Sequence, residues 1–236
     1  DAQGEGGVYA YAIAADGALT FLNRVSTGGP GPCHLAIDGA DSYIVATNYN
    51  GGSVCLLPIG ADGHLQKRSD FVQHAGSSVN PARQGEAHAH SVTFDRTNQW
   101  AYVCDLGMDQ VLAYRIDGKT RKLALDPALT VHAEPGQGPR HFDFSPSQEH
   151  CYVLNELGST VAVYDRDVAS GRLTARQLIS TLPDSWEGES HTADVHVSGN
   201  GRFLYASNRG HDSIAIFAIE PATGELSPVG HEPTGG

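Results

Sequence analysis

The chain has 236 residues, of which 27 are acidic and 15 basic, and its formal net charge at pH 7 is −12. A surface this acidic offers no electrostatic attraction to nucleic acid or to anionic membrane lipids, so we expect neither as a partner. No apolar stretch approaches the ~20 residues that a membrane-spanning helix needs. The 28 glycines and 12 prolines favour many short strands joined by tight turns.

The chain opens with two strand patterns. Residues 8–13 match residues 54–59 further along the chain, and residues 18–25 read as an outer strand beside them. Residues 8–27 therefore look like the second half of a repeating unit.

Four fuller copies of that unit follow. They are predicted at residues 32–75, 89–133, 139–182 and 192–229. One short polar residue marks the same place in each copy, six residues before an aliphatic one: Asn48, Asp105, Asn155 and Asn208. The markers recur at intervals of 57, 50 and 53 residues, and we expect each to cap a turn through bonds to the backbone. A repeat near fifty residues, with about four strands and almost no helical pattern, indicates β-propeller blades.

The sequence thus predicts an all-β fold, a β-propeller of four-stranded antiparallel blades with about four and a half blades in a single partial domain, 1–236. The opening half blade lacks the strands that would complete it. Residues 234–236 resemble residues 27–29, which precede a new first strand. We therefore expect this sequence to be a fragment of a longer chain.

Four titratable residues are predicted to meet at one mouth of the propeller channel. The first strand of a blade lines the channel and the second runs antiparallel to it, so the start of one and the end of the other share a rim. The two rim columns are Cys33, His90, Arg140, Ala193 and Tyr49, Leu106, Glu156, Arg209. Only 18% of the chain is charged, yet these columns bring together the groups that a catalytic site needs. The catalytic candidates are His90, Arg140, Glu156 and Arg209.

The next residue of each first strand gives a second set: His34, Ser91, His141 and Asp194. Side chains alternate along a strand, so we expect this set to face away from the first, between blades. The candidates for substrate binding are His34, His88, His141 and Asp194.

Each rim residue also has a purely structural interpretation. Arg140 and Glu156 lie on adjacent strands and could form an ion pair that only stabilises the blade. His90 could be a hydrogen-bonded channel histidine, and Arg209 a solvated turn residue. However, three blades place such residues at the same mouth, and this favours a functional site over the structural interpretation.

Other chemistries are disfavoured. His88 and His90 are spaced like two metal ligands, but no carboxylate or third histidine completes the set, so we expect no metal. No phosphate-binding glycine loop leads into a helix, and His90–Ser91 lacks the Gly-x-Ser-x-Gly elbow, so we expect neither a cofactor nor a serine nucleophile. The four cysteines show no Cys-x-x-Cys spacing, which favours free thiols and a cytoplasmic location.

Several motifs carry a resemblance to a known family. They are Gly138–His141, Tyr152–Leu157, His88–Val92 and Leu204–Arg209. These motifs resemble those of the lactonase family of seven-bladed β-propellers, which includes bacterial 6-phosphogluconolactonases and fungal 3-carboxy-cis,cis-muconate lactonizing enzymes. The resemblance spans essentially the whole chain, supports the four catalytic candidates, and implies that about two and a half blades lie outside this sequence.

The resemblance implies hydrolysis of a small anionic lactone, above all 6-phosphogluconolactone in the oxidative pentose phosphate route. A base, His90 or Glu156, would deprotonate water, and an arginine would hold the oxyanion or the anionic group of the substrate. Tight pairing with Arg140 would make Glu156 a poor base, which favours His90. Two alternatives stay open: a carboxymuconate-type lactonizing cycloisomerase, and a non-enzymatic propeller that binds a partner.

Overall fold

The computed structural model describes residues 4–235, and nearly all of its regular structure is β-strand. It begins with a two-stranded half blade, β1 (Gly7–Ile13) and β2 (Leu19–Ser26). Four antiparallel sheets follow, named here blades 1 to 4. No helix among residues 4–235 has the length and apolar character of a membrane span.

The blades follow one another along the chain. Blade 1 contains β3 (Pro32–Ile37), β4 (Tyr43–Asn48), β5 (Ser53–Pro58) and β6 (Asp70–Gln73). Blade 2 contains β7 (Ala89–Phe94), β8 (Ala101–Asp105), β9 (Gln110–Asp117) and β10 (Lys122–Leu125), then a 3₁₀ turn (Pro127–Leu129) and the short β11 (Val131–His132), which also pairs with β9. Blade 3 contains β12 (Pro139–Phe144), β13 (His150–Asn155), β14 (Thr160–Arg166) and β15 (Leu173–Ser180). Blade 4 contains β16 (His191–Val197), β17 (Phe203–Arg209), β18 (Ser213–Ile219) and β19 (Leu226–Pro233).

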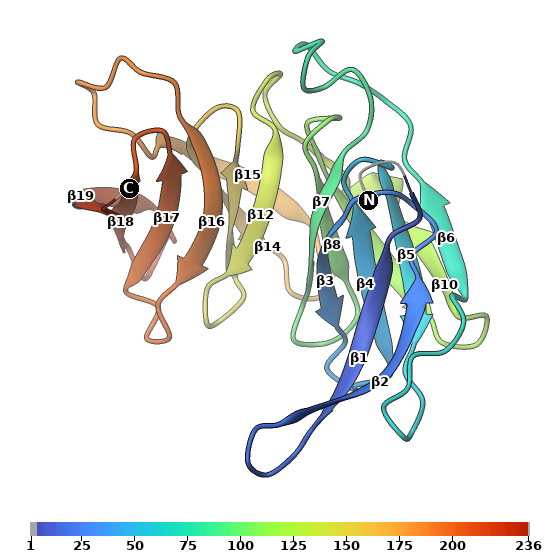
Figure 1. The fold of residues 1–236 in the computed structure, drawn as a ribbon. Helices are drawn as coiled ribbons and strands as arrows, with labels where there is room; N and C mark the ends of the chain where they lie inside the picture. The colour runs from blue at the N-terminus through green and yellow to red at the C-terminus, as the bar shows by residue number, and fades with distance from the viewer. Residues whose placement is uncertain (1–3, 236) are drawn as a thin grey trace.

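The blades stand side by side around a common axis (Figure 1). Their first strands are neighbours, since β3 contacts β7, β7 contacts β12, and β12 contacts β16. Within each blade the strands are ordered as in the sequence, from the axis outwards. The prediction of an all-β, propeller-like arrangement of antiparallel blades is confirmed.

The apolar core lies between neighbouring blades. Between blades 2 and 3, the ring of Tyr102 stacks on Phe142 at a centroid distance of 5.2 Å and meets the edge of Phe144 at 5.9 Å. Corresponding clusters join the other blade pairs and join the half blade to blade 1. Burying one such side chain contributes about 1.5–3 kcal/mol. The neighbours therefore hold each first strand, and with it each rim residue, in place.

The polar marker residues do secure the turn after the second strand. Asn48, Asn155 and Asn208 each donate from Nδ2 to a hydroxyl five residues later, on Ser53 (3.1 Å), Thr160 (3.0 Å) and Ser213 (3.3 Å). In these three the predicted bond to the backbone of the turn is therefore replaced by a bond to the hydroxyl at the start of the third strand. Asn208 Nδ2 also donates to a backbone carbonyl outside the turn, that of Thr181, at 2.9 Å. Asp105 does accept from the backbone, from the Met108 N–H at 3.1 Å. The four cysteines are free thiols, as predicted.

Each first strand carries a β-bulge at the rim. In blade 3, Pro139 pairs with Asn155 and His141 pairs with Leu154, which leaves Arg140 as the extra residue. The register shifts at the equivalent place in the other three blades. A bulge breaks the alternation of side chains and bends the strand locally, so two successive residues can both reach the channel.

A buried ion pair links blades 2 and 3, and its loss is expected to destabilise the fold. Arg166 Nη2 lies 2.6 Å from Asp95 Oδ2, and both side chains are fully buried. We expect Asp95→Asn to lower the free energy of unfolding by about 3–5 kcal/mol, because it leaves a buried guanidinium without its counter-charge. Chemical denaturation measures this. The matched control is Asp165→Asn, which breaks a partly exposed pair with Arg176 and should cost about 1 kcal/mol or less. Equal costs at the two sites would contradict the prediction.

Candidate active site

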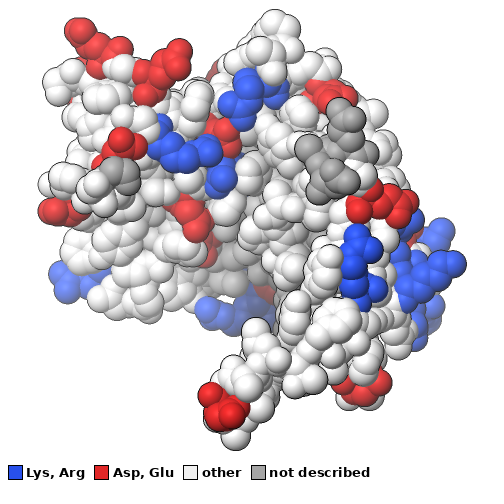
Figure 2. Space-filling view, viewed as in Figure 1, with Lys and Arg blue, Asp and Glu red and all other residues white. Residues whose placement is uncertain are grey.

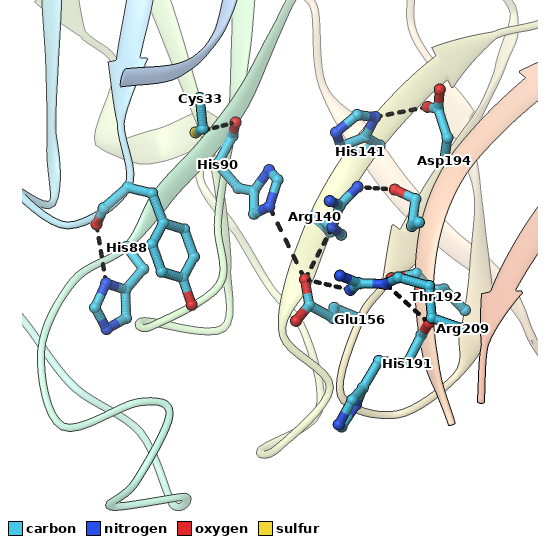
Figure 3. Close-up of polar contacts among 12 residues, drawn as sticks. Cys33, His88, His90, Arg140, His141, Glu156, His191, Thr192, Asp194 and Arg209 are labelled. Carbon is cyan, nitrogen blue, oxygen red and sulfur yellow. Dashed lines mark hydrogen bonds and ion pairs between the residues drawn. The ribbon is translucent and has the colours of Figure 1, made fainter. Parts of the chain in front are cut away.

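The carboxylate of Glu156 is the centre of the candidate site. Glu156 directly follows β13, its N–H donates to the Gly138 carbonyl, and only 4% of the residue is exposed. Arg140 Nε and Arg209 Nη2 lie 2.8 and 3.2 Å from its Oε2 (Figure 3). Arg83 Nη2 lies 2.6 Å from Oε1. The ion pair of Arg140 with Glu156 is thus formed, but within a cluster of three arginines around one carboxylate.

Backbone carbonyls fix two of these arginines. Arg140, from the bulge of β12, donates from Nη1 to the carbonyl of Ala193 in blade 4. Arg209, the last residue of β17, donates from Nη2 to the Thr192 carbonyl at 2.9 Å and from Nε to the His191 carbonyl at 3.4 Å. Among residues 4–235, Arg140 Nη2 and Arg209 Nη1 have no hydrogen-bond acceptor. Both arginines therefore keep a donor for a ligand.

Arg83 is a member of the cluster that the sequence pattern did not predict. It lies in the connection between β6 and β7, outside the repeated register, so it has no counterpart in the other blades that would draw attention to it. Its Nη2 also donates to the hydroxyl of Tyr49 at 3.2 Å. The length of this connection could have drawn attention to Arg83. Residues 74–88 contain no regular structure, and connections this long are commonly functional.

His90 faces the same carboxylate without a hydrogen bond to it. Its Nε2 is 3.9 Å from Glu156 Oε2, and its buried Nδ1 has no hydrogen-bond partner in the described structure. Burial lowers the pKa of His90 to about 2, and the positive charge of Arg140 acts in the same direction. The imidazole is therefore neutral at physiological pH and weakly basic.

His141 has the carboxylate partner that His90 lacks. Its Nδ1 lies 2.6 Å from Asp194 Oδ1 across the boundary of blades 3 and 4, and its ring centroid is 5.3 Å from that of His90 (Figure 3). Burial and Arg140 lower the pKa of His141 to about 4, and Asp194 opposes that shift. His34 completes the group, with its ring centroid 5.4 Å from His141.

The expected orientation of this second set needs a correction. His141 and His34 do bridge to neighbouring blades, since His34 Nδ1 accepts from the Val92 N–H of blade 2 at 3.3 Å. They do not face away from His90, however, because the bulge in each first strand breaks the alternation on which that expectation depended. The histidines of three blades therefore form one continuous group in the channel wall.

His88 is not part of the cluster around Glu156. Its ring stacks on Tyr49 at a centroid distance of 4.5 Å, and its Nδ1 lies 2.9 Å from the Tyr49 carbonyl oxygen. Tyr49 also forms a T-shaped contact with His90, at a centroid distance of 5.4 Å. His88 thus supports Tyr49, and through it the position of His90.

The cluster is a local concentration of positive charge on an acidic protein. Burial disfavours the ionised form of Glu156, but its hydrogen bond from Arg83 and the charges of Arg209 and Arg140 outweigh burial and hold its pKa below the usual range. On the face seen in Figure 2, basic and acidic side chains lie in separate small patches rather than one broad basic surface. The arrangement suits a small anion. Within residues 4–235, no group of three His, Cys, Asp or Glu residues is placed to hold a metal ion.

Comparison with known proteins connects this geometry to one family. The profile of the family described as "Lactonase, 7-bladed beta-propeller" matches residues 1–236. The chain is 36% identical over 228 residues to the 6-phosphogluconolactonase of Bacillus subtilis, which covers 96% of this chain and 64% of that protein. It is 33% identical over 241 residues to the 6-phosphogluconolactonase of Formosa agariphila, at 99% and 67% coverage.

Solved structures agree with this result. The periplasmic gluconolactonase PpgL of Pseudomonas aeruginosa superposes with a TM-score of 0.93 at 32% identity, covering 98% of this chain and 65% of that one. The chain thus spans about two thirds of the length of the proteins it matches.

Proposed function

The chain belongs to the lactonase family of seven-bladed β-propellers, and on this premise we propose that it carries the active site of an enzyme that hydrolyses a sugar-acid lactone. The observation that carries the proposal is the buried Glu156 carboxylate with Arg83, Arg140 and Arg209 around it, next to the histidines of the channel wall. Such a site presents fixed positive donors to an anionic substrate and neutral bases to a water molecule.

The proposed reaction is acyl transfer to water. A water oxygen attacks the lactone carbonyl carbon while a histidine takes one of its protons, and the carbonyl oxygen becomes an oxyanion. The free Nη2 of Arg140 and Nη1 of Arg209 stabilise that charge, a contribution of about 3 kcal/mol per donor. The bond from the carbonyl carbon to the ring oxygen then breaks, and the ring oxygen takes the proton back from the histidine. The product is the open hydroxy acid.

Glu156 serves in this scheme as the anchor of the arginines. Its lowered pKa and its three ion pairs make it a poor acceptor of a proton from water. This supports the expectation that tight pairing with arginine makes Glu156 a poor base and favours a histidine.

We place the base at His141 and keep His90, the candidate preferred from the sequence, as a substrate contact. Asp194 fixes the Nδ1 proton of His141 and leaves Nε2 as the acceptor, with no partner among residues 4–235. His90 has no such carboxylate, and its pKa is lower. A base of this kind contributes about 10²- to 10⁴-fold.

The proposed substrate is 6-phosphogluconolactone, which two similar proteins carry in their names. Protein expressed from the full-length gene should release acid from this lactone faster than the lactone hydrolyses spontaneously. A pH indicator follows the release of acid. Turnover of a carboxymuconate lactone with none of 6-phosphogluconolactone would favour the cycloisomerase instead, and turnover of neither would favour a binding propeller.

We also propose a cytoplasmic location. The free state of all four cysteines supports it, as does the cytoplasmic origin of phosphorylated sugar intermediates expected for this substrate. The similar PpgL is named as periplasmic, so cell fractionation with a tagged full-length protein is the deciding measurement.

A further inference from the structure

We propose that Arg83, on the connection between blades 1 and 2, forms a subsite for a phosphate or carboxylate group that the lactone carries away from its reacting carbonyl. The inference depends on the proposed lactonase function, because it assigns one end of that substrate. It adds a specificity-determining residue that lies outside the repeated motifs.

Arg83 is held differently from the other two arginines. Arg140 and Arg209 donate to backbone carbonyls, whereas the hydrogen bonds of Arg83 go only to the side chains of Tyr49 and Glu156. Both bonds use Nη2, so Nε and Nη1 have no acceptor among residues 4–235. About a third of the Arg83 side chain is exposed. Arg83 can therefore bind an anion with its remaining N–H groups while it stays paired with Glu156.

Arg83 is one wall of a groove. It has a volume of about 520 Å³ and lies between the connection that carries Arg83 and the connection before β16. Its walls include Gly158 and Ser159, just after Glu156, and Ser190 and His191. The groove therefore adjoins the catalytic cluster through Arg83, whose Nη2 lies 2.6 Å from Glu156 Oε1. We infer that a substrate with its carbonyl at Arg140 extends its other end into this groove.

The charges lining the groove make Arg83 decisive. Arg83 is the one basic guanidinium of the lining and Glu189 its one carboxylate. The hydroxyls of Ser159 and Ser190 already donate to the carbonyls of Ser190 and Arg209. Without Arg83 the lining has a net negative charge, which repels a phosphate. With it, a charge-assisted bond of the kind arginine forms with phosphate becomes available.

The test compares a phosphorylated and an unphosphorylated lactone. In full-length protein, we expect Arg83→Gln to raise KM for 6-phosphogluconolactone at least tenfold, with kcat within about threefold of wild type, and to change KM for glucono-1,5-lactone less than twofold. Arg83→Lys keeps the charge, so its KM for 6-phosphogluconolactone should lie between those of wild type and Arg83→Gln. The matched control Arg172→Gln removes an exposed arginine from the outer turn between β14 and β15 and should change neither substrate's kinetics.

Calorimetric titration with 6-phosphogluconate and with gluconate gives a readout that does not need turnover. We expect Arg83→Gln to weaken only the binding of the phosphorylated acid, at least tenfold, in a protein that circular dichroism shows to be folded. An equal loss of kcat on both lactones would show that Arg83 only positions Glu156, and would overturn the subsite. Failure of the proposed function is a separate result: wild-type protein would then hydrolyse neither lactone. If such protein also bound the two acids equally, the subsite would be overturned as well.

Discussion

Replacement of Glu156 by glutamine is expected to lower kcat/KM for the lactone by about 10³-fold or more. Its carboxylate orients both arginines proposed to stabilise the oxyanion, and the loss of one such donor alone costs about 10²- to 10³-fold. Glutamine has the same shape but no charge, so Arg83, Arg140 and Arg209 would repel one another without a counter-charge. The free energy of unfolding should fall by about 3 kcal/mol, the lower end of the range for a broken buried pair, because Arg83 and Arg209 are partly exposed.

Steady-state kinetics and chemical denaturation measure these two effects separately. The matched control is Glu149→Gln, an exposed glutamate in the turn before β13 that makes the same change in charge and should leave kcat/KM within twofold. If a folded Glu156→Gln protein kept more than a tenth of the wild-type kcat/KM, the anchoring role of this carboxylate would be wrong.

Replacement of Asp194 by asparagine is expected to lower kcat about 10²-fold, because His141 loses the group that fixes its tautomer and stabilises its protonated form. The pH profile should report the same residue. With the pKa of His141 near 4, kcat/KM for wild type should rise as pH increases through about 4 and then stay level towards neutrality. Removing the negative charge of Asp194 disfavours the imidazolium, so the rising part of the profile should move to lower pH in the variant.

Two variants separate this assignment from the alternative base. His196→Asn removes the second histidine bound to Asp194, which is well exposed, and should leave kcat nearly unchanged. If His90 were the base, its pKa near 2 would place the rising part of the profile lower in wild type, and Asp194→Asn would not move it. A larger loss of kcat in His90→Gln than in His141→Gln would show that the base is His90.

The repeat pattern was sufficient to predict the propeller because its markers serve the fold itself. Asn48, Asn155 and Asn208 recur at fixed offsets since every blade needs the same turn secured. The same register brought Arg140, Glu156 and Arg209 together correctly. Residues that repeat with the fold can be located from the sequence, because superimposable blades place them at equivalent points around one axis.

The features of the site that depart from the repeat could not be predicted from the sequence. Arg83 comes from a connection with no counterpart in the other blades, and only folding brings it within 2.6 Å of Glu156. The orientation of His141 depends on a β-bulge, and one inserted residue reverses the side of the strand that a period of two predicts. The base strength of His141 could not be predicted from the sequence either, since it depends on burial and on Asp194 from another blade.

The most direct test of the account is a crystal structure of the full-length protein with bound 6-phosphogluconate. We expect one carboxylate oxygen of the acid within about 3.2 Å of Arg140 or Arg209, with the imidazole of His141 or His90 beside the same carboxylate. A well-defined ligand elsewhere on the propeller, touching none of Arg140, Glu156, Arg209 and the channel histidines, would contradict the claim that these residues form the catalytic centre.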